Sequence, residues 1–188
     1  MTHPAAATRT GARYTAPAIA LHWLIAAGIA GTFGLGIYMH ELPLSPAKLQ
    51  LYAWHKWAGV SLFVLMWARL AWRIGHPPPA LPRAMPALLR RTAGAAHGLL
   101  YVLLLAIPVS GWLMSSAKGV PTVWFGVLPL PDLVARDAAL GERLQAIHQT
   151  LNFTLLGLIV AHAAAALKHH YVNRDDVLTR MLPGGATK

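Results

Sequence analysis

Three long blocks without charge constrain the fold of this chain more than any other feature. Residues 14–40, 92–117 and 144–167 contain no Asp, Glu, Lys or Arg. A helix needs roughly 20 mostly apolar residues to cross the core of a bilayer, so each block can span a membrane. A fourth apolar block contains Lys56 and Arg69 near its ends, where long basic side chains can reach the headgroups. We therefore predict four transmembrane helices, at about 17–39, 51–74, 94–116 and 145–169.

The composition supports an all-α membrane bundle. Only 12% of the 188 residues are charged and 56% are hydrophobic, whereas soluble domains carry about 25% charged residues. These values argue against a disordered chain and against an ordinary water-soluble domain. The first apolar block is longer than the ~7–15-residue core of a signal peptide, which favours a spanning helix over a cleaved leader. We expect one membrane domain over residues 1–188, folded as a transmembrane four-helix bundle.

The distribution of basic residues predicts the orientation. Eleven basic residues flank one side of the four predicted helices and five flank the other. The positive-inside rule then places both termini in the cytoplasm. This anchoring also explains most of the net charge of +10, so we expect no nucleic-acid partner.

The histidines are the candidate functional residues. The chain has no cysteine, which excludes iron–sulfur clusters, thiolate zinc sites and the covalent attachment of c-type haem. Ionisable residues inside membrane helices are costly and usually mark functional sites. Of the ten histidines, five lie inside the predicted helices: His22, His55, His97, His148 and His162.

Four of these histidines form two pairs at matching depths. His148 and His162 are 14 residues apart on the fourth helix, so they share one face and are separated by ~21 Å along its axis. His22 lies at the depth of His162, and His55 at the depth of His148. Two neutral imidazoles from different helices can be the axial ligands of a haem iron. The alternatives are hydrogen bonds between helices without a metal, or a zinc or copper site, for which no nearby Asp or Glu completes the ligand set.

The same 14-residue step finds further candidates on the other helices. Gly36 follows His22 by this step and would face the external haem without a side chain. Arg69 follows His55 and would face the cytoplasmic haem, where a guanidinium can pair with propionates. Gly59, one turn after His55, can let a ring plane approach the backbone. Close helix packing is the simpler explanation for either glycine.

The role of His97 stays open on spacing alone. It enters the third helix at the depth of His22 and His162, so it competes with either as a ligand. Otherwise it can donate a hydrogen bond to a propionate or to a quinone head group.

The order of several short motifs, from about residue 14 to residue 182, resembles the bacterial cytochrome b561 family. The motifs are His22–Trp23–Leu24, His55–x–x–x–Gly59, Leu65–x–x–x–Arg69, His97–x–x–x–Tyr101, Pro108–x–x–Gly111, Trp124–Phe125, His148, and His162 followed by His169–His170–Tyr171. The resemblance implies four helices holding two b haems, with two histidine ligands each. By position, His22 and His162 would ligate one haem and His55 and His148 the other, which leaves His97 as a non-ligand.

The resemblance also implies a function. Members of this family carry electrons between a one-electron donor and the quinone pool in the bacterial inner membrane, and at least one is described as a superoxide:ubiquinone oxidoreductase. We therefore expect a multi-pass enzyme that oxidises superoxide at the periplasmic face and reduces ubiquinone. Lipid and quinone are the expected partners, and no protein partner is required. Lys56 adjoins His55 and is the candidate catalytic residue that attracts the anion; alternatively, it reaches the headgroups or pairs with propionates.

Two other functions are alternatives to this one. Hydrogenases and formate dehydrogenases have similar di-haem anchor subunits, which pass electrons between a partner enzyme and the quinone pool. Short loops leave this chain little extra surface for such docking. A histidine-lined transporter would need intramembrane carboxylates for a proton relay, but the acids all fall in predicted loops or tails: Glu41, Asp132, Asp137, Glu142, Asp175 and Asp176.

Overall fold

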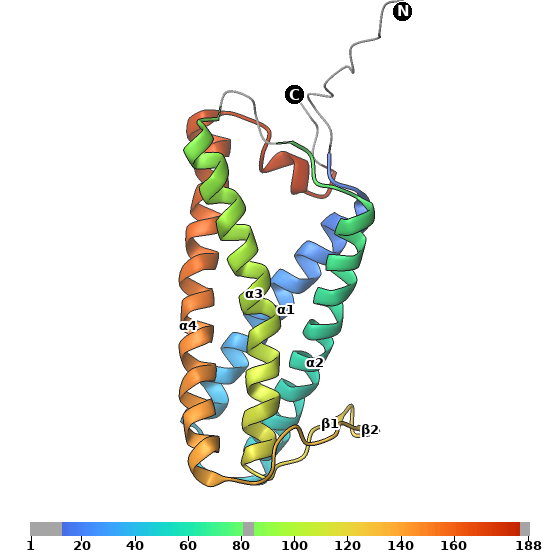
Figure 1. Ribbon diagram of the computed structural model, residues 1–188, viewed down its shortest axis with the longest axis vertical. Coiled ribbons are helices and arrows are strands. Elements are labelled where there is room, and N and C mark those ends of the chain that lie inside the picture. The colour runs from blue at the N-terminus through green and yellow to red at the C-terminus, as the bar shows by residue number, and fades with distance from the viewer. Residues whose placement is uncertain (1–12, 81–84, 185–188) are drawn as a thin grey trace, which may run out of the picture.

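Four long helices form a bundle in the computed structural model, which describes residues 13–80 and 85–184 (Figure 1). The first and last described residues lie at one end of the bundle, here called the termini end. A two-stranded antiparallel hairpin lies near the opposite end, here called the hairpin end. The predicted transmembrane four-helix bundle is confirmed. Its elements are α1 (Ala16–Glu41), α2 (Pro46–Gly75), α3 (Ala87–Ala117), β1 (Val123–Trp124), β2 (Leu128–Pro129) and α4 (Ala138–Lys168).

The outward-facing side chains are those of a membrane protein. All four helices are long and apolar enough to cross a bilayer, with mean hydropathies of 1.7, 1.2, 1.8 and 1.7 over their most apolar windows. Large apolar side chains point away from the bundle: Leu24 is 56% exposed, and Phe153 and Val160 are each 60% exposed. Such a surface would be unstable in water, whereas lipid solvates it. The chain is therefore a multi-pass membrane protein.

The helices extend further than the predicted spans. Helix α3 begins at Ala87 rather than near residue 94, and α4 begins at Ala138 rather than near residue 145. The charge-free blocks mark only the part of each helix inside the apolar core, while helical hydrogen bonding continues into the headgroup region. At the start of α4, Asp137 accepts a hydrogen bond from the Leu140 amide at 3.0 Å, a typical N-cap. Helix α3 runs without a break through Pro108.

The bundle divides into two closely packed pairs of helices. Helix α1 packs against α2 and α3 packs against α4, while α2 and α3 share a smaller contact. In the first pair the Leu62 side chain packs closely against Gly28, where an added methyl group would lie 2.6 Å from it. Because the two pairs meet less tightly than their members do, the space between them can accommodate a cofactor.

The C-terminal segment folds back across the termini end. After α4 it forms a π-helical turn, His169–Asn173, and then a short 3-10 turn, Thr179–Met181. The Trp23 indole donates to the Met181 carbonyl at 2.8 Å, and the Arg13 guanidinium donates to the Leu182 carbonyl at 2.6 Å. The segment therefore holds the N-terminal end of α1. The cytoplasmic placement of this end stays a prediction, and Arg9, Arg83 and Lys188, which contribute to it, lie outside the described residues.

Candidate functional site

The histidines form two pairs, and the two rings of each pair face each other across the space between the two helix pairs. The ring centres of His22 and His162 are 6.3 Å apart, and those of His55 and His148 are 6.4 Å apart. Helix α4 supplies one ring of each pair, while α1 and α2 supply the others. The residues predicted to lie at the same depth in the membrane are thus close together in the structure.

The separation of the rings fits two axial ligands of one metal ion. An imidazole nitrogen binds a metal at about 2.0 Å, and by ring geometry the ring centre lies about 1.1 Å behind that nitrogen. Two imidazoles on opposite sides of one ion therefore place their centres about 6.2 Å apart. The separations of 6.3 and 6.4 Å are close to this value, so both pairs fit the axial positions of a haem.

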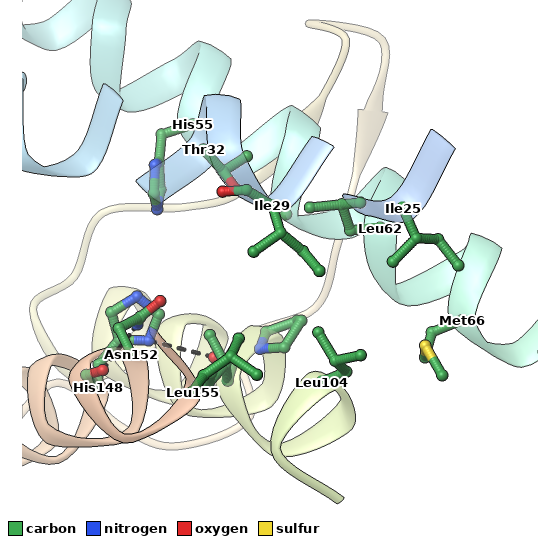
Figure 2. A pocket seen from close by; sticks show the side chains of 13 residues that line it. Ile25, Ile29, Thr32, His55, Leu62, Met66, Leu104, His148, Asn152 and Leu155 are labelled. Atoms are coloured by element: carbon green, nitrogen blue, oxygen red, sulfur yellow. Dashed lines mark hydrogen bonds between the residues drawn. The ribbon is translucent and has the colours of Figure 1, made fainter. Parts of the chain in front are cut away.

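An apolar cavity adjoins the pair at the hairpin end. Figure 2 shows His55 on one side of the cavity and His148 on the other, with Ile29, Leu104 and other aliphatic side chains between and beside them. The lining of this cavity is mostly apolar, as is typical of cofactor pockets. This lining fits a macrocycle held between the two rings.

His148 is fixed in a single tautomer by its neighbours on α3. Its Nδ1 lies 2.9 Å from Ser110 Oγ and 3.1 Å from the Ile107 carbonyl oxygen. The Ser110 hydroxyl donates its own proton to the same carbonyl at 2.7 Å, so both oxygens present lone pairs to the ring. Nδ1 must therefore carry the proton, which leaves Nε2 as the bare nitrogen available to a metal. A second hydrogen bond of this kind orients a metal-binding histidine and raises its basicity.

Two glycines let the backbone approach the rings of this pair. A methyl group at Gly111 would lie 3.1 Å from His148 Cε1, and one at Gly36 would lie 3.3 Å from His55 Cε1. Gly36 thus lies against the ring of His55. Gly59 lines the cavity, and a methyl group there would meet no atom within 4 Å. The contact of either glycine with a haem stays a prediction.

His55 differs from His148 in its hydrogen bonding. Among the described residues, its buried Nδ1 has no hydrogen-bond partner. A buried polar nitrogen without a partner is costly, and such atoms are common where a bound group is part of the site. The two Nδ1 atoms of this pair therefore differ: that of His148 is anchored to α3, and that of His55 has no partner among the described residues.

His97 lies at the edge of the pair at the termini end. Its ring centre is 5.3 Å from that of His162, closer than the about 6.2 Å needed for rings on opposite sides of one metal ion. His22, at 6.3 Å from His162, fits that separation better. Geometry therefore favours His22 over His97 as the partner of His162.

Arg69 lines a second cavity at the termini end. This small, partly open cavity lies between α1, α2 and α3, and its lining also includes Tyr14, Arg73 and Tyr101. Arg69 donates to the Ala18 carbonyl at 2.7 Å, one turn before His22. Within the described residues, neither Arg69 nor Arg73 forms an ion pair. Two guanidinium groups without an acid can hold an anionic group, as expected for propionates at Arg69.

Tyr14 supplies a neutral donor to this second cavity. Burial raises the pKa of its phenol from the ordinary value of 10.0, and the nearby charges of Arg73 and Arg69 oppose that shift. The hydroxyl therefore stays protonated at neutral pH and can donate a hydrogen bond to an anion.

Lys56 binds the loop between α3 and α4. Its ammonium donates to the Val120 carbonyl at 3.0 Å and to the Pro121 carbonyl at 3.1 Å. Two of its three protons are thus engaged, while the positive charge stays beside His55. A structural role in holding this loop therefore accompanies the predicted role in attracting an anion.

Sequence reasoning missed the residues of α3 that contact His148. Ser110 and the Ile107 carbonyl bind its Nδ1, and Gly111 packs against its ring. The motif Pro108–x–x–Gly111 enters the sequence analysis only as part of a family pattern. One signal for these contacts was available in the sequence. Ser110 and Gly111 are adjacent in an otherwise apolar stretch, and Gly111 follows His97 by 14 residues, which places it at the depth of the hairpin-end pair.

Proteins of two bacteria are similar in sequence to this chain. A protein of Escherichia coli (strain K12) named cytochrome b561 homolog 2 is 38% identical over 177 residues, covering 93% of this chain and 94% of that protein. Cytochrome b561 homolog 1 of the same organism is 30% identical over 172 residues, covering 91% and 97%. A Yersinia pestis protein named probable superoxide oxidase CybB is 28% identical over 172 residues, covering 91% and 96%.

The family assignment rests on nearly the whole chain. Residues 13–184 match the family described as prokaryotic cytochrome b561. This range includes all four helices and both histidine pairs. The family implies haem b binding and electron transfer in a membrane. The chain belongs to the prokaryotic cytochrome b561 family.

Proposed function

We propose that this chain binds two b haems in the bacterial inner membrane and passes electrons from superoxide to ubiquinone. One haem lies between His22 and His162, and the other between His55 and His148. The observation that carries the proposal is the pair of ring separations, 6.3 and 6.4 Å, both close to the about 6.2 Å expected for two imidazoles on one metal ion. The name of the Yersinia pestis relative supports superoxide as the electron donor.

The protein contributes ligands, orientation and exclusion of water. A bound haem supplies reversible one-electron chemistry at its iron. The four imidazoles would bind the two irons, and the hydrogen bonds that His148 Nδ1 donates to the Ile107 carbonyl and to Ser110 Oγ fix the ring of His148. Arg69 and Arg73 neutralise the propionates at the termini end. The aliphatic lining of the larger cavity keeps water from the hairpin-end site.

The overall reaction balances without an acid or base at the site of superoxide oxidation. Each superoxide gives up one electron and leaves as dioxygen, with no proton gained or lost. Ubiquinone takes up two electrons and two protons to become ubiquinol, so two superoxide ions reduce one quinone. The proposal places superoxide at the hairpin end, where Lys56 adjoins His55.

Haem content and superoxide kinetics test this function. The purified protein should contain two b haems per chain, counted by the pyridine haemochrome assay. Reconstituted with ubiquinone in vesicles, its haems should be reduced rapidly by superoxide, and ubiquinol should accumulate at half the amount of superoxide consumed. A content of one haem per chain would overturn the pairing. Haems that superoxide fails to reduce would overturn the donor and favour the anchor-subunit alternative.

Two substitutions of Lys56 separate its charge from its contacts with the loop. A basic rim over an apolar opening can raise association rates about 10-fold or more, in a salt-dependent manner. Lys56→Gln should lower the rate of haem reduction by superoxide several-fold at low ionic strength. Lys56→Arg keeps the charge and donors to Val120 and Pro121, and should retain most of the rate. Equal rates in all three proteins at every ionic strength would exclude attraction by Lys56.

A further inference from the structure

The uncharged hairpin between α3 and α4 lies beside α2. Residues 119–131 contain no charged side chain, and β1 and β2 pair within them. Figure 1 shows this hairpin next to the hairpin-end half of α2, outside the bundle. We propose that the hairpin inserts its tip into the lipid leaflet at this end of the protein.

Contacts with α2 place the hairpin at the depth of the membrane. The Trp57 indole donates to the Val123 carbonyl at 2.6 Å, and the Trp124 indole donates to Ser61 Oγ at 3.3 Å. Trp57 and Ser61 follow the start of α2 at Pro46 by about 16 and 22 Å along the helix axis. The whole helix is about 45 Å long, equal to a bilayer with its headgroups. The hairpin therefore contacts α2 well away from the first residue of that helix and within the depth of the bilayer.

Five consecutive carbonyls of the hairpin region are paired within the protein. The region contains three prolines, at positions 121, 129 and 131, which have no amide proton to satisfy. A chain segment that enters lipid must pair its polar groups internally, because hydrocarbon offers no partners. Each of five consecutive carbonyls accepts a hydrogen bond from the protein: Val120 and Pro121 from Lys56, Thr122 from Leu130, Val123 from Gly126 and Trp57, and Trp124 from Val127.

The tip presents apolar side chains on a strained turn. Phe125 is 58% exposed, Val127 is 83% exposed and Leu128 is 51% exposed. Phe125 adopts a φ of 51°, a strained conformation that is uncommon for residues other than glycine. A bulky aromatic at such a position is stabilised when its exposed ring transfers from water to lipid.

Continuity with the lipid-facing side of α2 identifies lipid as the occupant of this surface. Trp54 and Trp67 of α2 are 50% and 53% exposed, and both belong to a helix that spans the membrane. The ring of Phe125 lies 5.6 Å from that of Trp57, so the apolar tip extends this surface. Since Lys56 and Trp57 directly follow His55, insertion would also hold the loop against the part of α2 that carries this histidine.

Spin labels on single cysteines test the insertion, because the native chain contains no cysteine. Val127→Cys and Leu128→Cys place labels at the tip. Val160→Cys, on the exposed surface of α4, is the lipid control, and Ala135→Cys, between the hairpin and α4, is the control for water. Collision rates with apolar oxygen and with a polar nickel chelate are measured in vesicles of neutral phospholipid. A circular dichroism spectrum confirms that each labelled protein is folded.

The proposal expects both tip labels to behave like that at position 160, with high oxygen and low nickel accessibility. Tip labels that resemble the one at position 135 would place the hairpin in water and overturn the proposal. Protection from both reagents, or broadening by a second label, would show that protein covers the tip and would also overturn it. These measurements do not depend on haem content, so their failure is distinguishable from failure of the proposed function.

Discussion

Gly111 lies directly against the ring of His148, where a methyl group would come within 3.1 Å of Cε1. Neither partner can easily move away. The ring is bound to Ser110 and Ile107, and the backbone of α3 is part of a helix packed along α4. The close approach thus links the packing of two helices to the position of a proposed ligand.

Gly111→Ala should therefore weaken the hairpin-end haem site. We expect the methyl group to displace the ring of His148, to cost about 1–3 kcal/mol of stability through overpacking, and to lower the occupancy of that haem. Absorbance spectra with haem counting, together with thermal unfolding in detergent, measure both effects.

Gly94→Ala is a matched control on the same helix, since a methyl group there would meet no atom within 4 Å. Its expected effect is neutral or stabilising, by up to about 1 kcal/mol, because alanine favours the helix. Equal behaviour of the two variants would show that contact with His148 does not limit haem binding.

Ser110→Ala should shift the midpoint potential of the hairpin-end haem to more positive values. The hydroxyl helps to accept the Nδ1 proton of His148, which raises the basicity of the ring and favours the ferric state. Without it the ring is a weaker donor, and haem affinity should fall by about 10-fold. Redox titration monitored by absorbance resolves the two haems.

Thr154→Ala is the control for Ser110→Ala. This hydroxyl on α4 also donates to a backbone carbonyl, that of Thr150, at 2.8 Å, but the side chain is exposed. Neither potential should change in this variant. An unchanged potential in Ser110→Ala, with both haems present, would show that the Ile107 carbonyl alone controls the ring.

His97→Ala should retain both haems. The 5.3 Å separation of His97 and His162 is too short for rings on opposite sides of a metal ion at about 6.2 Å. The termini-end haem should lose only a neighbouring polar group, which alters its potential or its rate of quinone reduction. His22→Ala is the comparison and should lose that haem. Loss of a haem in His97→Ala, together with its retention in His22→Ala, would reverse the assignment.

The sequence was sufficient to predict the helices and the histidine pairs. Charge-free blocks identify membrane spans because lipid excludes charge regardless of tertiary structure. The 14-residue step between His148 and His162 fixes their shared face because helical geometry is regular. Both inferences depend on one helix at a time, which explains why they needed no knowledge of packing.

Contacts between different helices and loops could not be predicted in this way. The hydrogen bond from His148 to Ser110 depends on how far α3 is rotated and shifted against α4, which the period of either helix leaves undetermined. The strand pairing within residues 123–129 was not predicted, because strands of two residues carry no alternation of polar and apolar side chains. The hydrogen bonds of Lys56 to Val120 and Pro121 likewise follow from the position of that loop.

Removal of haem should loosen the bundle between its two pairs of helices. Helices α1 and α2 pack closely, as do α3 and α4. In each histidine pair, the two rings face each other across the space between these halves. A ligand present at about 1,000 times its Kd stabilises a folded protein by about 4 kcal/mol. For a chain of this length that corresponds to roughly 8–16 °C in Tm.

Protein expressed with haem synthesis blocked should therefore melt at least about 8 °C lower than the loaded protein, and added haem should restore the difference. Size-exclusion elution after heating measures the Tm of both forms in the same detergent. His22→Ala with His55→Ala, which removes one proposed ligand from each pair, should melt like the depleted protein and gain nothing from added haem. Equal melting temperatures of loaded and depleted protein would mean that direct helix contacts alone hold the two halves together.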